Sequence, residues 1–339
     1  MTRKMAWIAK IEEINTILNA DKICAYRVGG WWVVDSVNKY QIDDLVVYIS
    51  IDSWIPTEVA PFLSKGKEPR EYNGVKGERL RTVKLRGQVS QGLLLPLGIG
   101  AYNVNAQLDE GTDVSELLGI QKWEAPIPAQ LVGVMRGSFP SFIRKTDQER
   151  VQNLKKELEQ WVTEYATWEV TEKLDGSSMT VYYNQGVFGV CSRNIDLVKD
   201  ENNSFWKTAI SMRLDKMLID HGFNLALQGE LVGEGIQGNP YNLTGQQFFL
   251  YNIFDIDRQE YMSPWSVRPW ANNARVPYVP LLEREFKLTG ATIDSLLNYA
   301  EGKSVLNSNT EREGLVFKRN GQHYASFKAI SNLFLIGEK

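Results

Sequence analysis

Residues 171–180 read TEKLDGSSMT, in which a lysine stands two positions before an Asp-Gly pair, inside a run typical of a buried strand. Lysine and aspartate avoid burial unless they are paired or have a chemical task. Because side chains alternate between the two faces of a strand, we expect Glu172 and Leu174 on one face and Lys173 and Asp175 on the other. On these residues alone, an exposed Lys-Asp pair at a strand end is the simpler interpretation.

Lys173 also has a chemical interpretation. A deprotonated amine attacks electrophilic phosphorus to form a phosphoramidate, but the ordinary pKa of a lysine is about 10.4. Partial burial and nearby cations or a metal lower that pKa. Gly176 would let the backbone turn sharply beside a ligand. Lys173 is therefore a candidate nucleophile.

Five downstream segments place a charged or aromatic residue at the end of an apolar strand. They are Arg193 in CSRNIDL, Glu230 in LQGELVGEG, Phe254 and Asp255 in YNIFDID, Glu313 in EREGLVFKRN, and Lys328 in YASFKAISN. Together with Lys173, this ordered series resembles the motif set of the covalent nucleotidyltransferases, which are the ATP-dependent polynucleotide ligases and RNA capping enzymes. Each motif is weak alone, whereas six ordered matches over residues 173–328 are a strong signal.

The resemblance implies that Lys173 takes AMP from ATP, so that positive charge must gather around the reacting phosphates. Arg193 and Lys328 would supply that charge. Glu313 and Glu230 would hold Mg²⁺ or Mn²⁺, directly or through water, although Glu230 could instead accept hydrogen bonds from ribose hydroxyls. Taken singly, the two cations are equally consistent with solvated charges at strand ends.

The resemblance also gives roles to residues beside these motifs. Phe254 would stack on the purine, although a core position is the commoner use of a phenylalanine. Asp175 would belong to the catalytic set and Glu172 to the ATP-binding set. Ligases that act on RNA tend to carry two lysines two residues apart in the last motif, but Ser326 stands at the first position here. Lys318 is our candidate to replace the missing lysine.

The composition limits the classes of protein that remain. The chain has 339 residues, 43% of them hydrophobic and 23% charged, which suits two globular domains. Two histidines nearly exclude a zinc site or a Ser-His nucleophile, so that any metal should be a hard, oxygen-liganded ion. Two distant cysteines favour a reduced intracellular chain. A net charge of −3 means that nucleic-acid binding would need local basic patches.

Two folded parts are predicted. Residues 1–100 contain short β-branched and aromatic runs broken by Gly, Asn and Pro, which favour an all-β barrel or sandwich. Residues 101–140 include three prolines in the span 126–140 and are expected to form a connector. Residues 141–339 alternate apolar strands with helices, which predicts an α+β domain built largely on antiparallel strands.

Two helices are predicted in the second part. In residues 146–162, Thr146 and Glu149 form a capping-box pattern. The first turn of that helix would present Arg150, Gln152 and Asn153 to a triphosphate, because helix N-termini favour phosphate. A surface helix with a solvated face is an equal alternative. Residues 204–222 form the clearest helical pattern, with Gly222 at its end.

Within the superfamily, three features narrow the resemblance. The lysine motif continues as K-x-D-G-S, which is similar to RNA ligases, and the chain ends 11 residues after Lys328, which leaves no room for a C-terminal OB barrel. A β-rich module comes first. This order resembles the nick-sealing RNA ligases of the Deinococcus and Naegleria type, with an N-terminal OB domain and a C-terminal adenylyltransferase domain. The resemblance implies ATP-dependent joining of 3′-OH and 5′-phosphate ends, with RNA on the 3′-OH side.

The N-terminal module offers candidate nucleic-acid contacts. Four basic residues fall within eight positions, namely Arg79, Arg81, Lys84 and Arg86. Strand alternation would divide them two and two between faces, so that a solvated strand is an equal alternative. OB barrels commonly bind oligonucleotides. The expected partner is a nicked duplex with an RNA 3′-OH strand, bound by a monomer in the cytoplasm or, in a eukaryote, the nucleus, with no membrane association.

Two other functions remain open. A capping-type guanylyltransferase would use the same lysine chemistry with GTP in place of ATP. A non-catalytic relative would bind nucleic acid through the same scaffold and form no covalent adduct. The unbroken Lys-Glu-Glu-Lys series favours an enzyme.

Overall fold

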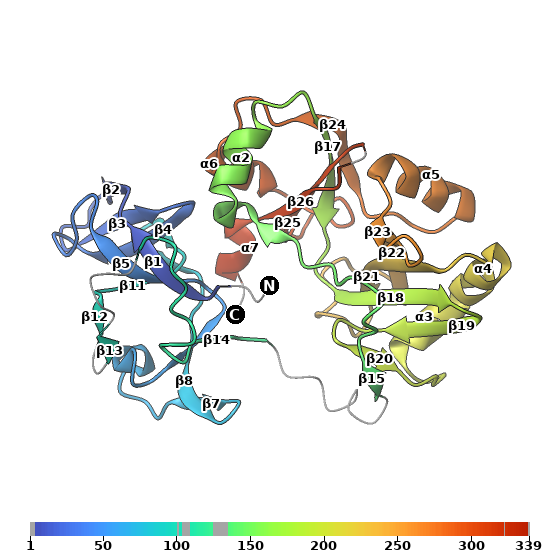
Figure 1. Cartoon of the computed structure of the whole chain (residues 1–339), viewed down its shortest axis with the longest axis horizontal. Helices are drawn as coiled ribbons and strands as arrows, with labels where there is room; N and C mark the ends of the chain where they lie inside the picture. The colour runs from blue at the N-terminus through green and yellow to red at the C-terminus, as the bar shows by residue number, and fades with distance from the viewer. Residues whose placement is uncertain (1–3, 100–101, 104–108, 125–134, 322, 338–339) are drawn as a thin grey trace. The chain divides into compact units, whose positions relative to one another are not determined.

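The computed structural model describes residues 4–99, 102–103, 109–124, 135–321 and 323–337 (Figure 1). The chain divides into two compact units between residues 126 and 127. Each unit has hydrophobic clusters of its own. The units are therefore described separately.

The first unit is built from short antiparallel strands. One sheet has the order β1-β5-β11 and a second has the order β2-β3-β4, while a third has the order β14-β6-β8-β7; two further pairs are β9-β10 and β12-β13. The bounds are β1 Ala6–Lys10, β2 Glu13–Thr16, β3 Ile23–Val28, β4 Trp31–Ser36, β5 Leu45–Ile49, β6 Ser53–Pro56, β7 Arg70–Tyr72, β8 Val75–Arg79, β9 Val83–Leu85, β10 Gln88–Ser90, β11 Leu93–Leu95, β12 Gly98–Ile99, β13 Tyr102–Asn103 and β14 Gln121–Lys122.

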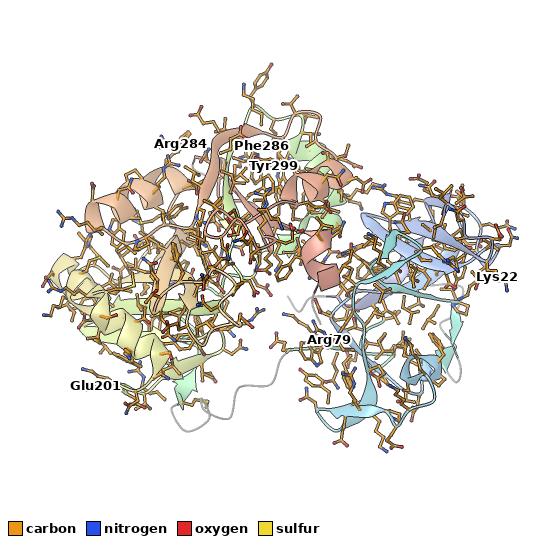
Figure 2. The ribbon with its side chains drawn as sticks, turned by 180° about the vertical axis from the view of Figure 1, so that it is seen from behind. Lys22, Arg79, Glu201, Arg284, Phe286 and Tyr299 are labelled. Carbon is orange, nitrogen blue, oxygen red and sulfur yellow. The ribbon has the colours of Figure 1, made fainter. Side chains whose placement is uncertain are left out.

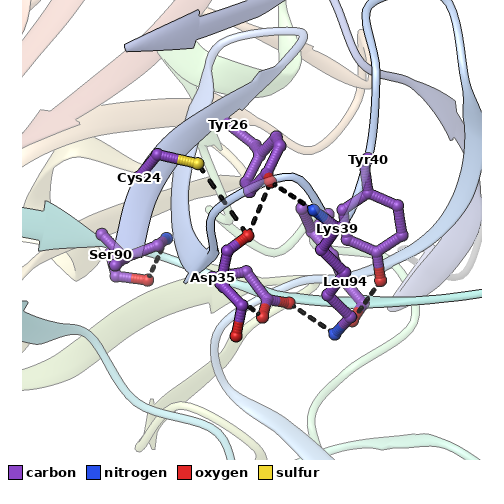
Figure 3. Close-up of polar contacts among 9 residues, drawn as sticks. Cys24, Tyr26, Asp35, Lys39, Tyr40, Ser90 and Leu94 are labelled. Atoms are coloured by element: carbon purple, nitrogen blue, oxygen red, sulfur yellow. Dashed lines mark hydrogen bonds and ion pairs between the residues drawn. The ribbon is translucent and has the colours of Figure 1, made fainter. Parts of the chain in front are cut away.

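Polar contacts form both within and between these small sheets (Figure 3). The Tyr40 hydroxyl donates to the Leu94 carbonyl at 3.2 Å, and the Tyr26 hydroxyl donates to the Ser36 carbonyl at 2.7 Å. The Val34 amide donates to the Ser90 hydroxyl at 2.9 Å, which ties β4 to β10. Because buried hydroxyls need partners, these contacts fix how the sheets close on one another.

The predicted connector is divided by the structure. Val114, Leu118 and Ile120 are buried in the core of the first unit, and β14 pairs with β6. Apolar spacing in 114–120 thus outweighs the proline signal that suggested a linker. Residues 125–134 of the predicted connector lie outside the described residues, and residues 135–138 already belong to a strand of the second unit.

The second unit contains two larger sheets (Figure 1). The seven-stranded sheet has the order β15-β20-β19-β18-β21-β22-β23, and the five-stranded sheet has the order β16-β26-β25-β17-β24. Among the described strands of these two sheets, all neighbouring strands are antiparallel except β16 and β26, which are parallel. The bounds are β15 Met135–Ser138, β16 Glu149–Arg150, β17 Thr167–Lys173, β18 Ser177–Asn184, β19 Val187–Cys191, β20 Ile195–Leu197, β21 Leu225–Gly233, β22 Gln246–Asp255, β23 Glu260–Tyr261, β24 Leu281–Lys287, β25 Gly314–Arg319 and β26 Ser326–Ile330.

Helices cover one face of each sheet. Helices α3 (Ser204–Ser211), α4 (Leu214–His221) and α5 (Pro264–Ala274) pack on the seven-stranded sheet, and α2 (Lys155–Trp161) and α6 (Ile293–Ala300) pack on the five-stranded sheet. The rings of Phe286 in β24 and Tyr299 in α6 stack with centroids 5.5 Å apart (Figure 2). A last helix, α7, spans Asn332–Gly337. The opposite faces of both sheets carry the polar side chains described below.

The prediction of a helix over residues 146–162 is wrong for residues 146–154. Glu149 and Arg150 form β16 in parallel with β26, residues 151–153 form a single 3₁₀ turn, and α2 begins only at Lys155. The Thr146 hydroxyl, expected to cap the helix, instead lies 3.0 Å from the hydroxyl of Tyr251. Pairing with β26 satisfies backbone groups that a helix would otherwise satisfy.

The helix predicted over 204–222 is present as two pieces. Asn203 caps the start of helix α3. The helical conformation is interrupted before α4 at Arg213, whose φ is 57°. Gly222 ends α4 with a φ of 74°, as predicted. In the part of the chain that the structure describes, no helix combines the length and the apolar character that crossing a membrane requires.

Candidate active site

Lys173 is the last residue of β17, at the point where the five-stranded sheet passes into the seven-stranded sheet. A short turn, residues 174–176, links it to β18. Gly176 lies against β21, and a Cβ added there would stand 2.5 Å from the Leu231 carbonyl oxygen. A glycine is therefore needed at 176 for close backbone approach, which keeps the turn tight behind the lysine.

Lys173 forms an ion pair with Glu313. The two come together because Lys173 pairs with Gly314 across β17 and β25, and the Nζ–Oε2 distance is 2.5 Å. Burial lowers the pKa of the Lys173 amine, but the carboxylates of Glu313 and Glu230 outweigh it and raise the pKa above its ordinary value. The protein alone therefore holds the amine protonated, which differs from the lowered pKa that we expected.

Glu230 approaches the same point from the seven-stranded sheet. It lies in β21 opposite Ser178 of β18. Burial raises the pKa of Glu230 to about 8, with Lys173 opposing the rise and Glu313 and Asp175 adding to it. The amide of Asp175 donates to the Tyr241 hydroxyl at 2.5 Å. The structure thus brings Asp175, Glu230 and Glu313 close enough to Lys173 to act on the charge of its amine.

Two predicted cations meet at a residue that the sequence analysis missed. Asp147 Oδ1 lies 3.5 Å from the Lys328 amine, and Asp147 Oδ2 lies 3.9 Å from the Arg193 guanidinium. Arg193 follows β19, whereas Lys328 lies in β26 of the other sheet. Asp147 carried no signal because it falls in a segment that was assigned to a helix.

The residues predicted to contact a triphosphate are not presented by a helix. Arg150 is buried and pairs with Lys328 across β16 and β26. Gln152 is also buried, and the Asn153 amide donates to the Glu149 carboxylate at 2.8 Å. Arg150 is therefore placed beside the last motif by strand pairing instead of by a helix N-terminus.

Phe254 is a core residue, which corrects its prediction as a stacking platform. Its side chain is 0% exposed and packs with Tyr182, Cys191 and Ile143, while Tyr261 contacts its ring edge-on at 5.2 Å. The segment that contains Ile143 covers this end of the sheet and closes it to a ligand.

Tyr251, three residues before Phe254 in β22, lies near Glu230. A β-bulge between β21 and β22 leaves Tyr251 between two paired residues, Leu250 and Asn252. Bulges re-aim side chains, and this one brings the Tyr251 hydroxyl to Thr146 and within 3.5 Å of the Ser178 hydroxyl. Burial and the nearby Glu230 carboxylate raise the pKa of Tyr251 to about 12.

Lys318 lies behind Tyr251 and pairs with Ser326 across β25 and β26. Its buried amine donates to the Tyr251 carbonyl and stands 5.9 Å from the centre of the Tyr278 ring. Burial lowers the pKa of Lys318 to about 8 against the attraction of Glu169. Lys318 thus stands next to Ser326 in the ladder, and its amine is committed to the backbone of β22.

Glu172 faces away from Lys173, so its prediction as an ATP contact is corrected. Its carboxylate accepts a hydrogen bond from the Val305 amide at 2.7 Å. Burial raises the pKa of Glu172, while hydrogen bonds from Ser304 and Val305 oppose the rise. Strand alternation puts it on the other side of β17, where it anchors the loop before β25.

The four basic residues of the first unit have different environments. Arg81, Lys84 and Arg86 are exposed, and Arg86 forms the two-residue turn between β9 and β10 together with Gly87. Arg79 instead pairs with Asp52 at 2.6 Å and lies 3.8 Å from the centre of the Trp123 ring (Figure 2). The structure therefore gives Arg79 a structural role inside the unit.

Replacement of Arg79 should reveal this role. Arg79→Ala is expected to lower the free energy of unfolding by about 1–2 kcal/mol, because it removes both the ion pair and the cation–π contact. Arg81→Ala, at an exposed neighbouring site, is the matched control and should leave stability within about 0.5 kcal/mol. Urea unfolding followed by tryptophan fluorescence measures both. Equal stability of the two variants would contradict the structural role.

The carboxylates suit a hard divalent cation. Among the described residues, no three His, Cys, Asp or Glu side chains form a cluster that could hold a metal by themselves. Mg²⁺, however, commonly takes one or two carboxylates and completes its octahedron with water and substrate phosphates. Burial raises the pKa of Glu230, and the neighbouring Glu313 carboxylate adds to the rise, so that a cation between the two would relieve their repulsion.

Comparison with known proteins agrees with this arrangement. A family model described as RNA ligase matches residues 166–330, and an OB-fold domain model matches residues 5–97. Among curated proteins, none matches the chain. The apo structure of an Asp-to-Ala mutant of Naegleria gruberi RNA ligase is 43% identical, with a TM-score of 0.90, over 99% of this chain and 98% of that chain.

Two further solved structures are similar. Naegleria gruberi RNA ligase with PPi has 43% identity and a TM-score of 0.89 over 99% of both chains. A Lys-to-Ala mutant of the same ligase, with ATP and Mn, has 43% identity and a TM-score of 0.89 over 98% of both chains.

The fold is that of a covalent nucleotidyltransferase. The chain belongs to the RNA ligase family. The predicted family resemblance, the enzymatic class, and the fold of an N-terminal OB domain followed by an antiparallel α+β ligase domain are therefore confirmed.

Proposed function

We propose that this RNA ligase uses ATP to seal nicks with 3′-OH and 5′-phosphate ends through a lysyl-AMP intermediate on Lys173. The observation that carries the proposal is the convergence of both sheets on one amine, with Glu313 at 2.5 Å and Glu230 also acting on its charge. The similar Naegleria gruberi structures with ATP and Mn, and with PPi, support ATP as the nucleotide.

In the first step, the Lys173 amine attacks the α-phosphorus of ATP. An N–P bond forms, the bond from the α-phosphorus to the bridging oxygen breaks, pyrophosphate leaves, and the amine loses its proton. Lys328 and Arg193 lie near enough to Asp147 to share it, and they would turn to the phosphates as negative charge grows there. Arg150, beside Lys328 in the ladder, would add a third cation.

Glu230 and Glu313 would hold Mg²⁺ or Mn²⁺, directly or through water, and the metal would supply charge stabilisation at the phosphates. Tyr251, in place of Phe254, would stack on the purine. Lys318 would fix Tyr251 through the hydrogen bond to its backbone carbonyl. The bulge and the buried lysine thus set one wall of the nucleotide site.

The later steps pass AMP to a 5′-phosphate and then join the 3′-OH with loss of AMP. The partner would be a nicked duplex with an RNA 3′-OH strand, and Arg81, Lys84 and Arg86 of the first unit would contact its phosphates. The buried thiols of Cys24 and Cys191, neither in a disulfide, support a reducing compartment such as the cytoplasm or nucleus.

The decisive test is covalent labelling. Wild-type protein, incubated with α-labelled ATP and Mg²⁺ and then denatured, should carry a labelled band that Lys173→Ala lacks. Lys216→Ala, which changes an exposed helical lysine, should retain the band. No band from the wild type would refute the proposal, and labelling by GTP in place of ATP would identify a guanylyltransferase instead.

A further inference from the structure

Residues 141–147 lack regular secondary structure, yet their backbone is fixed by side chains of the seven-stranded sheet. The Gln228 amide, in a side chain that is 1% exposed, donates to the Arg144 carbonyl at 2.8 Å. The Tyr261 hydroxyl contacts the carbonyls of Arg144 and Lys145 at 3.0 and 3.3 Å. The side chains of Gln228 and Tyr261 thus hold the backbone of residues 144–145 in one conformation. This is the arrangement of a preorganised binding element.

The same segment sends its apolar side chains inward and its charged side chains outward. Ile143 is 3% exposed, and the Phe142 ring meets Tyr182 edge-on at 5.4 Å. Arg144 and Lys145 are exposed. The burial of their apolar neighbours therefore fixes the two cations at the surface.

These cations adjoin Arg193. The Lys145 amine donates to the Asn194 side chain at 3.0 Å, and the Asn194 carbonyl accepts from the Phe139 amide at 3.0 Å. The two segments, 139–145 and 193–194, therefore lie side by side. We call the three exposed side chains Arg144, Lys145 and Arg193 the cationic rim.

The cationic rim carries little compensating charge. Within the described ranges, no carboxylate lies within ion-pair distance of Arg144 or Lys145, and the carboxylate paired with Arg193 is that of Asp147, at 3.9 Å. Arg193 is 58% exposed on its side chain. Arg144 and Lys145 add two exposed positive charges to that of Arg193, which shares Asp147 with Lys328, so the rim has a local attraction for anions although the whole chain has a net charge of −3.

The segment also connects the cationic rim to the site. Two residues after Lys145, Asp147 reaches Lys328, and Thr146 contacts the Tyr251 hydroxyl. The side chains of Lys173, Glu230 and Glu313 are half-buried, whereas those of the rim are exposed. An extended polyanion can follow such a path, because it offers one phosphate after another along its length.

We propose that the cationic rim binds the sugar–phosphate backbone of the strand that bears the 5′-phosphate. This inference rests on the proposed function, in which that phosphate must reach AMP on Lys173. Arg193 would meet the terminal phosphate near the site, and Arg144 and Lys145 would meet the phosphodiesters that follow. Backbone contacts of this kind position a strand without reading its sequence.

The test compares Arg144→Ala/Lys145→Ala with wild type. Binding is measured on a nicked RNA duplex, with EDTA and without ATP, and on a duplex that lacks the 5′-phosphate strand. We expect a Kd about tenfold higher on the nicked duplex, a salt-dependence slope smaller by about 1.5–2, and little change on the duplex without that strand. Transfer of AMP from the preformed lysyl-AMP enzyme to the nick should slow by about tenfold at sub-saturating duplex.

Labelling with ATP separates this inference from the proposed function. The double variant should form lysyl-AMP within about twofold of the wild-type rate, since its two side chains lie at the surface beside the nucleotide site. Lys207→Ala/Lys216→Ala removes the same charge from the helical face of the same sheet and should bind the nick normally.

Several results would overturn the inference. Unchanged binding and AMP transfer in the rim variant would remove the rim from the interface, and an equal loss in the helical control would reduce the effect to net charge. An equal loss on the duplex that lacks the 5′-phosphate strand would assign the rim to another strand. Failure of wild type to form lysyl-AMP would instead refute the proposed function.

Discussion

Glu313→Ala is expected to reduce the rate of lysine adenylation by about 10²–10³-fold while the protein remains folded. The substitution removes the partner that lies 2.5 Å from the Lys173 amine and one of the two carboxylates proposed to hold the metal. Glu313→Gln keeps the shape of the side chain and should lose a similar factor, because it is the charge that orients the amine and attracts the cation.

The measurement is the single-turnover rate of AMP-adduct formation, together with the midpoint of thermal unfolding. Glu311→Ala is the matched control, since Glu311 lies two residues away and pairs only with Lys303 among the described residues. It should adenylate at the wild-type rate. A Glu313→Ala protein that retained full activity would exclude Glu313 from the active site.

Glu169→Ala is expected to lower the free energy of unfolding by about 3–5 kcal/mol, the largest stability loss that we predict. Glu169 is 1% exposed, pairs with Arg268 at 2.9 Å and accepts from the Tyr278 hydroxyl at 2.5 Å. Removal of the carboxylate leaves the Arg268 guanidinium without its partner in a site that excludes most water. Lys318, paired with Glu169 across β17 and β25, loses a stabilising charge as well.

Urea unfolding of three proteins separates an unpaired charge from a simple cavity. Glu169→Leu/Arg268→Met replaces the pair by apolar side chains and should be more stable than Glu169→Ala, because the Arg268 guanidinium is no longer left without a partner. Glu311→Ala breaks an exposed pair and should cost less than about 1 kcal/mol. A double variant less stable than the single variant would show that packing, and not charge, dominates at Glu169.

The positions of the candidate site residues Lys173 and Glu313 were predictable because they follow strand alternation. In TEKLDG, a period of two places Lys173 apart from Glu172, and the structure has Glu172 bound to Val305 on the far side. Glu313 precedes a regular strand that pairs with β17 in simple register. The local sequence was therefore sufficient to predict the face on which a side chain lies wherever the strand pairing is regular.

The misplaced residues lie where pairing is irregular or non-local. The bulge between Gln228 and Gly229 leaves Tyr251 outside the regular pairing of β21 and β22, and a one-residue slip is invisible to a period-two pattern. The parallel pairing of Arg150 with Lys328 joins segments 178 positions apart, so a capping-box pattern suggested a helix instead. Asp147 could be found only after that pairing was known.

The position of Lys173 between two sheets has a mechanical consequence. Glu313 is tied to β17 by the same ladder that holds Lys173, so these two residues travel together in any hinge motion. Glu230 belongs to the other sheet, beyond the turn at residues 174–176. The distance from the Lys173 amine to Glu313 would therefore stay constant in such a motion. The distance from the same amine to Glu230 would change with the angle between the two sheets.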